Sequence, residues 1–312
     1  MSLKSSLLLI LTFFVAILLR FYKFVETLNL GTDQAAAYIL ADRIIHSSYF
    51  LLNGPLTSLW QLNLLPPHYY YIVAVIYKFS PSYLSLPLTF SFFNLASVFL
   101  IFLTGKIMFN VRAGLITSLL YAVAEVIVWY GRDFWEPHLV PFFIIVSLLF
   151  LALADKKKNI FYLHLSIFFF FFSFLYISSV LLFPVYLLSV IWIIKKRNLI
   201  KINPILYTLL LIIIYGLFFY IPVIIFEFLN GFPSYNFILQ VLYGKEVLAG
   251  TQNMSYLLSL IEHIYLFTKS LLIYTDFRLS LILFSMFLIG QLYLLKKFNA
   301  NFYFKILFFF FI

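Results

Sequence analysis

Residues 7–22 read LLLILTFFVAILLRFY, an apolar run that begins just after Lys4. A helix that crosses a membrane needs about 20 mostly apolar residues, within a range of about 17–25. The run has the basic start and apolar core of a secretory signal, but bulky residues stand where a cleavage site would need small ones. We therefore expect a retained membrane-spanning helix.

The composition extends this expectation to the whole chain. Of its 312 residues, 64% are hydrophobic and 10% are charged, whereas a soluble domain has about 45–50% apolar and about 25% charged residues. Too little polar surface remains for a water-facing globule, which excludes a soluble enzyme, a disordered tail and a nucleic-acid-binding module. The net charge of +10 is then typical of Lys and Arg in cytoplasmic loops. The absence of cysteine excludes disulfides and cysteine metal sites.

Clusters of basic residues set the number of spans. If every cluster is cytoplasmic, each interval between clusters must contain an even number of crossings. The clusters are Lys4, Lys106 with Arg112, 156–158, 195–201 and 296–297. The predicted spans are 7–22, 84–104, 113–130, 139–154, two that turn around 176–179, 205–226, 279–295 and one from about 302. We predict an all-α integral membrane protein, a polytopic bundle of about nine spans, in the plasma membrane with a cytoplasmic N-terminus.

The predicted layout is a single transmembrane domain over 1–312, with a first outer loop over 23–83 and a second large outer loop over 228–278. Because the last apolar run stops at Ile312, we also expect a C-terminally truncated chain. Most acidic residues fall in the outer segments. Acids contribute little to topology, so this bias indicates a functional outer face.

The first outer loop is predicted to contain two interfacial helices. The first covers about 33–47, where Ala37, Leu40, Ala41 and Ile44 repeat at helical spacing. Thr32 or Asp33 can cap its free N–H groups. The second runs from Pro66-Pro67 to about Phe79, and its tyrosines 69–71 suit a membrane–water boundary. In the second large loop we expect a helix over 235–243 and a flexible loop over 244–253.

The densest polar cluster lies at 129–138, between two predicted spans. On a helix, Glu125, Trp129 and Arg132 would share one face. An acid at mid-membrane costs about 2.5–3.5 kcal/mol, so Glu125 should lie near the boundary or have a cationic partner, for which Arg132 is the nearest candidate.

Acids and bases at one boundary suit an enzyme that moves a group from a lipid-phosphate carrier. Inverting glycosyl transfer needs a carboxylate that takes the proton of the acceptor hydroxyl, and Asp33 is placed for that role. It also needs cations for the departing phosphate, for which Arg132 is the first candidate and Lys78 or Arg43 are alternatives. Further candidates for substrate or phosphate binding are Asp133, Glu136, His138, His68 and Tyr69.

Several segments resemble the GT-C glycosyltransferases, closest to the branch of dolichyl-phosphate-mannose protein mannosyltransferases and aminoarabinose transferases. They are 17–22, Gly31-Thr32-Asp33-Gln34-Ala35, Leu65-Pro66-Pro67-His68-Tyr69-Tyr70-Tyr71, 106–114, 130–143 and 222–232, so that the resemblance covers roughly 10–245. It implies a polyprenyl-phosphate-linked sugar donor, a lipid, glycan or protein acceptor, and a catalytic aspartate that Asp33 matches. Many members have Asp-Glu where this chain has Asp33-Gln34.

Structural alternatives accompany these assignments. Asp33 can simply cap a helix, Arg132 and Asp133 can form a boundary ion pair, and tyrosines 69–71 can anchor the chain to the membrane. A divalent metal held by His68 and His138 with an acid is left open, because the two histidines have no spacing motif. The alternative functions are a transporter or lipid-carrier flippase and a non-catalytic membrane assembly subunit.

Overall fold

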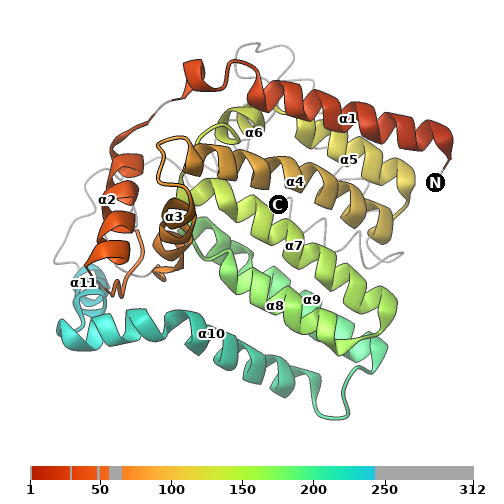
Figure 1. Cartoon of the computed structure of the whole chain (residues 1–312). Helices are drawn as coiled ribbons and strands as arrows, with labels where there is room; N and C mark the ends of the chain where they lie inside the picture. Colours follow the sequence, from red (N-terminus) through yellow and green to blue (C-terminus); the bar gives the residue numbers. More distant parts are fainter. Residues whose placement is uncertain (1, 29, 48–49, 56–64, 243–312) are drawn as a thin grey trace, which may run out of the picture.

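The computed structural model describes residues 2–28, 30–47, 50–55 and 65–242, and the regular structure in these ranges is entirely helical (Figure 1). Five helical segments in them are long and apolar enough to cross a membrane. They are Leu3–Phe21 (α1), Ser85–Met108 (α4), Glu136–Lys157 (α7), Ser179–Arg197, which includes α9 (Phe183–Arg197), and Pro204–Leu229 (α10). The chain is therefore a helical membrane protein, as its composition predicts.

The long helices lie side by side, and the chain turns repeatedly between the same two ends of the bundle (Figure 1). One end contains the start of α1 and the turns from α4 to α5 (Val111–Val123), from α7 to α8 (Ile160–Phe172) and from α9 to α10. These turns carry the basic clusters predicted to be cytoplasmic, and we call this the basic end.

The opposite end gathers the short helices α2 (Thr32–His46), α3 (His68–Phe79), α6 (Glu125–Tyr130) and α11 (Pro233–Leu242), with the 3-10 turns η1 (Val25–Thr27) and η2 (Ile177–Leu182). Helices form over both predicted segments of the first outer loop. All acidic residues in the described ranges belong to this end except Asp155, so we call it the acidic end.

One predicted span is wrong as a continuous helix. The segment 113–130 is divided into α5 and α6, because Ala124 between them is extended, with φ −61° and ψ 118°. Two features of the structure favour the break. Glu125 stands in the first turn of α6, where a negative charge suits the helix dipole, and the carbonyls of Tyr121 and Ala122 at the end of α5 bind Arg20.

Arg20, in the last turn of α1, is fully buried. Its Nη1 donates to the Ala122 carbonyl over 2.9 Å, and its Nε donates to Oδ1 of Asn94 in α4 over 2.7 Å. A cation beside free carbonyls at a helix C-terminus is electrostatically favourable. This single side chain therefore joins α1, α4 and α5.

The apolar core has two main parts. One packs α8, α9 and α10 together with the end of α7. The other joins the short helices to the bundle, because the small residues Ala37 and Ala41 of α2 pack with Tyr69 and Val73 of α3 and with residues of α4 and α7. The outer sides of α1 and α10 expose apolar side chains, as expected for surfaces that face lipid.

At the basic end, Asp155 is 2% exposed and accepts a hydrogen bond from Nε of Arg197 over 2.6 Å. The pair connects the last turn of α7 to the last turn of α9. Part of the cluster 195–201 therefore also stabilises the bundle. The predicted spans 279–295 and from 302, and the predicted loop 244–253, lie outside the described residues.

Candidate functional site

The first turn of α2 carries Asp33 at the acidic end. Gly31 is the N-cap residue, and no side chain caps the helix from that position. Gln34 instead reaches back, and its Oε1 accepts a hydrogen bond from the Gly31 backbone N–H over 3.0 Å, which is the returning half of a capping box. The predicted capping by Thr32 or Asp33 is not found in the described ranges, where the side chain of Gln34 satisfies the N–H of Gly31 instead.

Gln34 also connects α2 to the segment before α7. Its Nε2 donates to Oδ2 of Asp133 over 3.0 Å, while Oδ1 of Asp133 accepts from the Phe134 N–H over 2.6 Å. Gln34 is buried, on the same face of α2 as Ala37 and Ala41. Three hydrogen bonds therefore run in series from Gly31 through Gln34 and Asp133 to Phe134, and we call them the Gln34–Asp133 bridge.

Asp33 points away from this buried face and is exposed. Its carboxylate acts electrostatically on Tyr69, Tyr70 and Glu136, so the starts of α2, α3 and α7 meet here. Burial, followed by the charges of Glu136 and Asp33, raises the pKa of Tyr70 to about 12. Tyr70 is thus neutral at physiological pH. In the described ranges Asp33 makes no hydrogen bond and no ion pair.

Asp133 lies in a less polar environment than Asp33. Burial raises its pKa to about 6, although the hydrogen bonds from Phe134 and Gln34 act in the opposite direction. The burial of its charge therefore outweighs these two bonds. Asp133 also acts electrostatically on Tyr69, which places Asp33, Asp133 and Glu136 around one tyrosine; we call these three residues the acidic cluster.

Arg132 lies at the acidic end but does not meet Asp33. Its Nη2 donates to the Tyr22 carbonyl over 2.6 Å and to the hydroxyl of Thr27, and its Nη1 has a 3.5 Å contact with the Leu19 carbonyl. The guanidinium thus binds the free carbonyls where α1 ends, as cations do at helix C-termini. Within the described ranges it forms no ion pair with Asp133, so the alternative of a boundary ion pair between them is not found.

The remaining candidates are divided between core and surface. Tyr69 is 2% exposed. His68 lies between the rings of Phe172 and Phe219 and contacts the Phe172 carbonyl through Nε2 at 3.0 Å. Burial lowers the pKa of His68 to about 4, so this ring is neutral and carries no charge for a phosphate.

His138 stacks on Tyr130, with 4.7 Å between ring centroids. Neither ring nitrogen has a hydrogen-bond partner among the described residues. Lys78 is exposed in the last turn of α3. It is nine positions after Tyr69, which is about 13 Å along a helix axis, so it stands away from the acidic cluster.

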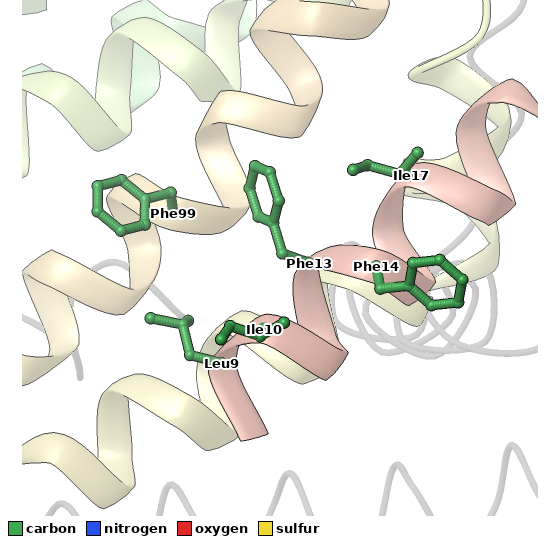
Figure 2. Close-up of a pocket in the computed structure, with 6 residues that line it drawn as sticks. All are labelled: Leu9, Ile10, Phe13, Phe14, Ile17 and Phe99. Carbon is green, nitrogen blue, oxygen red and sulfur yellow. The ribbon is translucent and has the colours of Figure 1, made fainter. Parts of the chain in front are cut away.

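Two further observations bear on ligands. In the described part of the chain, no three His, Cys, Asp or Glu side chains come together as metal ligands. An open groove of about 450 Å³ lies between α1 and α4, lined by Leu9, Ile10, Phe13, Phe14, Ile17 and Phe99 (Figure 2). Its lining contains no polar side chain, so it suits contact with acyl chains rather than chemistry.

Sequence reasoning missed two residues that organise the acidic end, Gln34 and Arg20. The signal for Arg20 was available, because a charged residue inside an apolar run needs an internal partner. Gln34 gave no comparable signal, since its partner Asp133 is 99 positions further along the chain.

Comparisons with models of known protein families, with curated proteins and with solved structures find no match for this chain.

Proposed function

We propose that the protein is a membrane glycosyltransferase of the GT-C type, which moves a sugar from a polyprenyl-phosphate carrier to an acceptor hydroxyl at the acidic end of the bundle. The acidic end faces the outside of the plasma membrane in this proposal. The observation that carries it is the state of Asp33, which is exposed in the first turn of α2 and, within the described ranges, caps no backbone N–H and forms no ion pair.

In the proposed reaction, the Asp33 carboxylate takes the proton from the acceptor hydroxyl. The acceptor oxygen then forms a bond to the anomeric carbon, and the bond from that carbon to the phosphate oxygen breaks. The polyprenyl phosphate leaves with the electron pair, and the sugar is inverted. An exposed carboxylate without a competing partner suits this role, because a base must be reached by the proton it takes.

The surroundings of Asp33 support the same proposal. Tyr69 and Tyr70 come from a helix predicted to lie at the membrane boundary, where the carrier phosphate would lie. The Arg132 guanidinium has five N–H donors, and the contacts with α1 and η1 occupy part of them. We retain Arg132 as the proposed phosphate ligand because its remaining donors lie at the same end as Asp33.

The test is transfer by the purified full chain in lipid nanodiscs, supplied with radiolabelled polyprenyl-phosphate sugars and a membrane extract as acceptor source. Asp33→Asn should abolish label transfer and leave expression and melting temperature unchanged. Asp42→Asn is the matched control, since Asp42 is also exposed on α2, and it should remain active. Full activity of the Asp33→Asn protein would remove the base assignment.

One observation favours a second candidate, a transporter or lipid-carrier flippase. The predicted span 113–130 is broken at Ala124, next to the charged Glu125, and transporters often build sites from discontinuous helices. The same labelled donors distinguish the two functions in sealed vesicles. A transporter would carry unchanged label across the bilayer, whereas a transferase forms a new labelled product.

A further inference from the structure

The Gln34–Asp133 bridge joins two segments that are distant in sequence at the residue next to Asp33. Gln34 uses both ends of its amide, since Oε1 accepts from Gly31 and Nε2 donates to Asp133. Asp133 uses both carboxylate oxygens, since Oδ2 accepts from Gln34 and Oδ1 accepts from Phe134. Every donor in this series of hydrogen bonds therefore faces an acceptor.

A carboxylate at position 34 would disrupt this match. The Oε1 position could still accept from Gly31, but the second oxygen would face Oδ2 of Asp133, and two acceptors with like charge would replace a hydrogen bond. Such pairs of carboxylates repel unless one takes up a proton. The hydrogen bond to Asp133 thus explains why position 34 carries an amide and not a carboxylate. This reason does not apply to the neighbouring exposed positions of α2.

The bridge also fixes where Asp33 stands. Phe134 is fully buried, and its N–H holds Asp133, so the far end of the bridge belongs to the core. Gln34 is buried on α2, and its bond to Gly31 closes the first turn of the helix. Asp33 lies inside that closed turn, where its backbone has little freedom although its side chain is exposed.

We propose that Gln34 is a positioning residue, which together with Asp133 holds the first turn of α2 so that the Asp33 carboxylate stands at a fixed place at the acidic end. Gln34 itself does not touch the reacting atoms in this account. The catalytic part of this inference rests on the proposed function, whereas the bridge and the order of Asp33 do not.

The sharpest test exchanges the amide and the carboxylate between positions 34 and 133. Gln34→Glu puts two acceptors together, and Asp133→Asn puts two donors together, so each single variant loses the central hydrogen bond. In the double variant Gln34→Glu/Asp133→Asn, Glu accepts from Gly31 and from the new Asn, whose oxygen accepts from Phe134. All three hydrogen bonds return, and only the central one, between positions 34 and 133, has its direction reversed. The matched control is Ala36→Glu, which adds the same charge at an exposed position of α2.

The first readout is independent of activity. Because the sequence has no cysteine, Asp33→Cys provides a single attachment point for a spin label in the full chain. We expect an ordered label when Asp33→Cys is the only change. The label should be more mobile when Gln34→Glu is added, and ordered again when the double variant is added. Equal mobility in all of them would overturn the proposed bridge.

The second readout is transfer by the same variants with Asp33 in place. A displacement of about 1 Å near reacting groups can cost on the order of 100-fold in rate, so Gln34→Glu should lower kcat by about 10- to 100-fold, with little change in the KM for donor. The double variant should recover most of this loss. If the single variants lower only the melting temperature and leave kcat unchanged, Gln34 is merely structural and the positioning role is wrong.

The two proposals fail in different ways. If Asp33→Asn transfers sugar normally, the proposed function and the catalytic part of the inference fall together, whereas label order restored in the double variant still supports the bridge. If Asp33→Asn is inactive but Gln34→Glu has normal label order and normal kcat, the proposed function stands and the positioning inference is overturned.

Discussion

Nε2 of Gln34 lies 3.0 Å from Oδ2 of Asp133, and each of these residues comes one position after a residue expected to act on the substrate, Asp33 and Arg132 respectively. The contact between α2 and the polar segment before α7 is therefore made by the second residue of each pair. Asp33 is left exposed on one side of it, and Arg132 extends to the end of α1 on the other. Both functional candidates belong to segments that this hydrogen bond holds together.

The raised pKa of Asp133 predicts how stability depends on pH. The folded protein holds this proton up to a pKa of about 6, above the ordinary value of 3.8. Between these values the folded state binds more protons than the unfolded chain, so the contribution of Asp133 to stability is present at low pH and is lost as pH rises through 6. Melting temperatures in detergent from pH 4 to 7.5 should decrease across this window.

The control for this prediction is the single variant Asp133→Asn, in which position 133 no longer titrates and no new carboxyl group is introduced. The melting temperature of this variant should lack the decrease between pH 4 and 6 that is due to Asp133. An identical pH profile in the parent protein and the Asp133→Asn variant would show that Asp133 is not the group that titrates.

The two arginines bound to helix ends should differ in their effect on stability. Arg20 is fully buried and bonded to Asn94 and Ala122, and each buried acceptor left without a donor costs about 1–3 kcal/mol. Arg20→Met should therefore lower the melting temperature strongly. Arg132→Met should lower it less, because the side chain of Arg132 is only partly buried.

The effect on sugar transfer should have the opposite order, with the larger effect at Arg132. If Arg132 binds the carrier phosphate as proposed, Arg132→Met should raise the KM for donor, although it lowers the melting temperature less than Arg20→Met does. A variant Arg132→Met with unchanged KM would remove Arg132 from the proposed site and leave it as the residue that binds the end of α1.

The sequence predicts the long helices well, because α1, α4, α7 and α10 are apolar over the length that a bilayer requires. The turn around η2 follows from the short distance between two basic clusters. The break at Ala124 could not be predicted in this way, since alanine is the best helix former and what favours the break is distant: Arg20 binds the end of α5.

The acidic end could be predicted only in part. Helical spacing predicts α2, the prolines and tyrosines from Pro66 predict α3, and the polar composition of 129–138 indicates a site, because these signals are local. Which side chain meets which is set by tertiary contacts. Arg132 and Asp133 are neighbours in sequence, yet one binds α1 and the other binds α2, and no periodicity within either segment distinguishes the two directions.

The ion pair at the basic end provides a further prediction. Asp155 is 2% exposed and bonded to Arg197, so Asp155→Asn should weaken the contact between α7 and α9 and cost about 1–3 kcal/mol. The orientation of the Asp155→Asn protein in the membrane should be unchanged, because acids contribute little to topology. Lys157→Gln, an exposed change in the same turn, is the control and should leave the melting temperature nearly unaltered; an equal loss in both variants would contradict a specific role for the pair.

The crossing of α4 and α5 depends on two glycines that lie against each other. A Cβ added to Gly105 would stand 2.8 Å from the Gly114 Cα, and one added to Gly114 would stand 2.5 Å from the Phe102 carbonyl oxygen. Both neighbours are backbone atoms, so the helices themselves would have to separate, and overpacking of this kind costs about 1–3 kcal/mol. Gly105→Ala and Gly114→Ala should each lower the melting temperature.

Gly216 in α10 is the matched control within the chain. A Cβ added there meets only the ring of Phe171, at 3.7 Å, which is an ordinary van der Waals contact, and alanine favours a helix over glycine by about 1 kcal/mol. Gly216→Ala should therefore leave the melting temperature unchanged or raise it. If all three alanine variants melt alike, close packing of the backbones at Gly105 and Gly114 is not what holds α4 against α5.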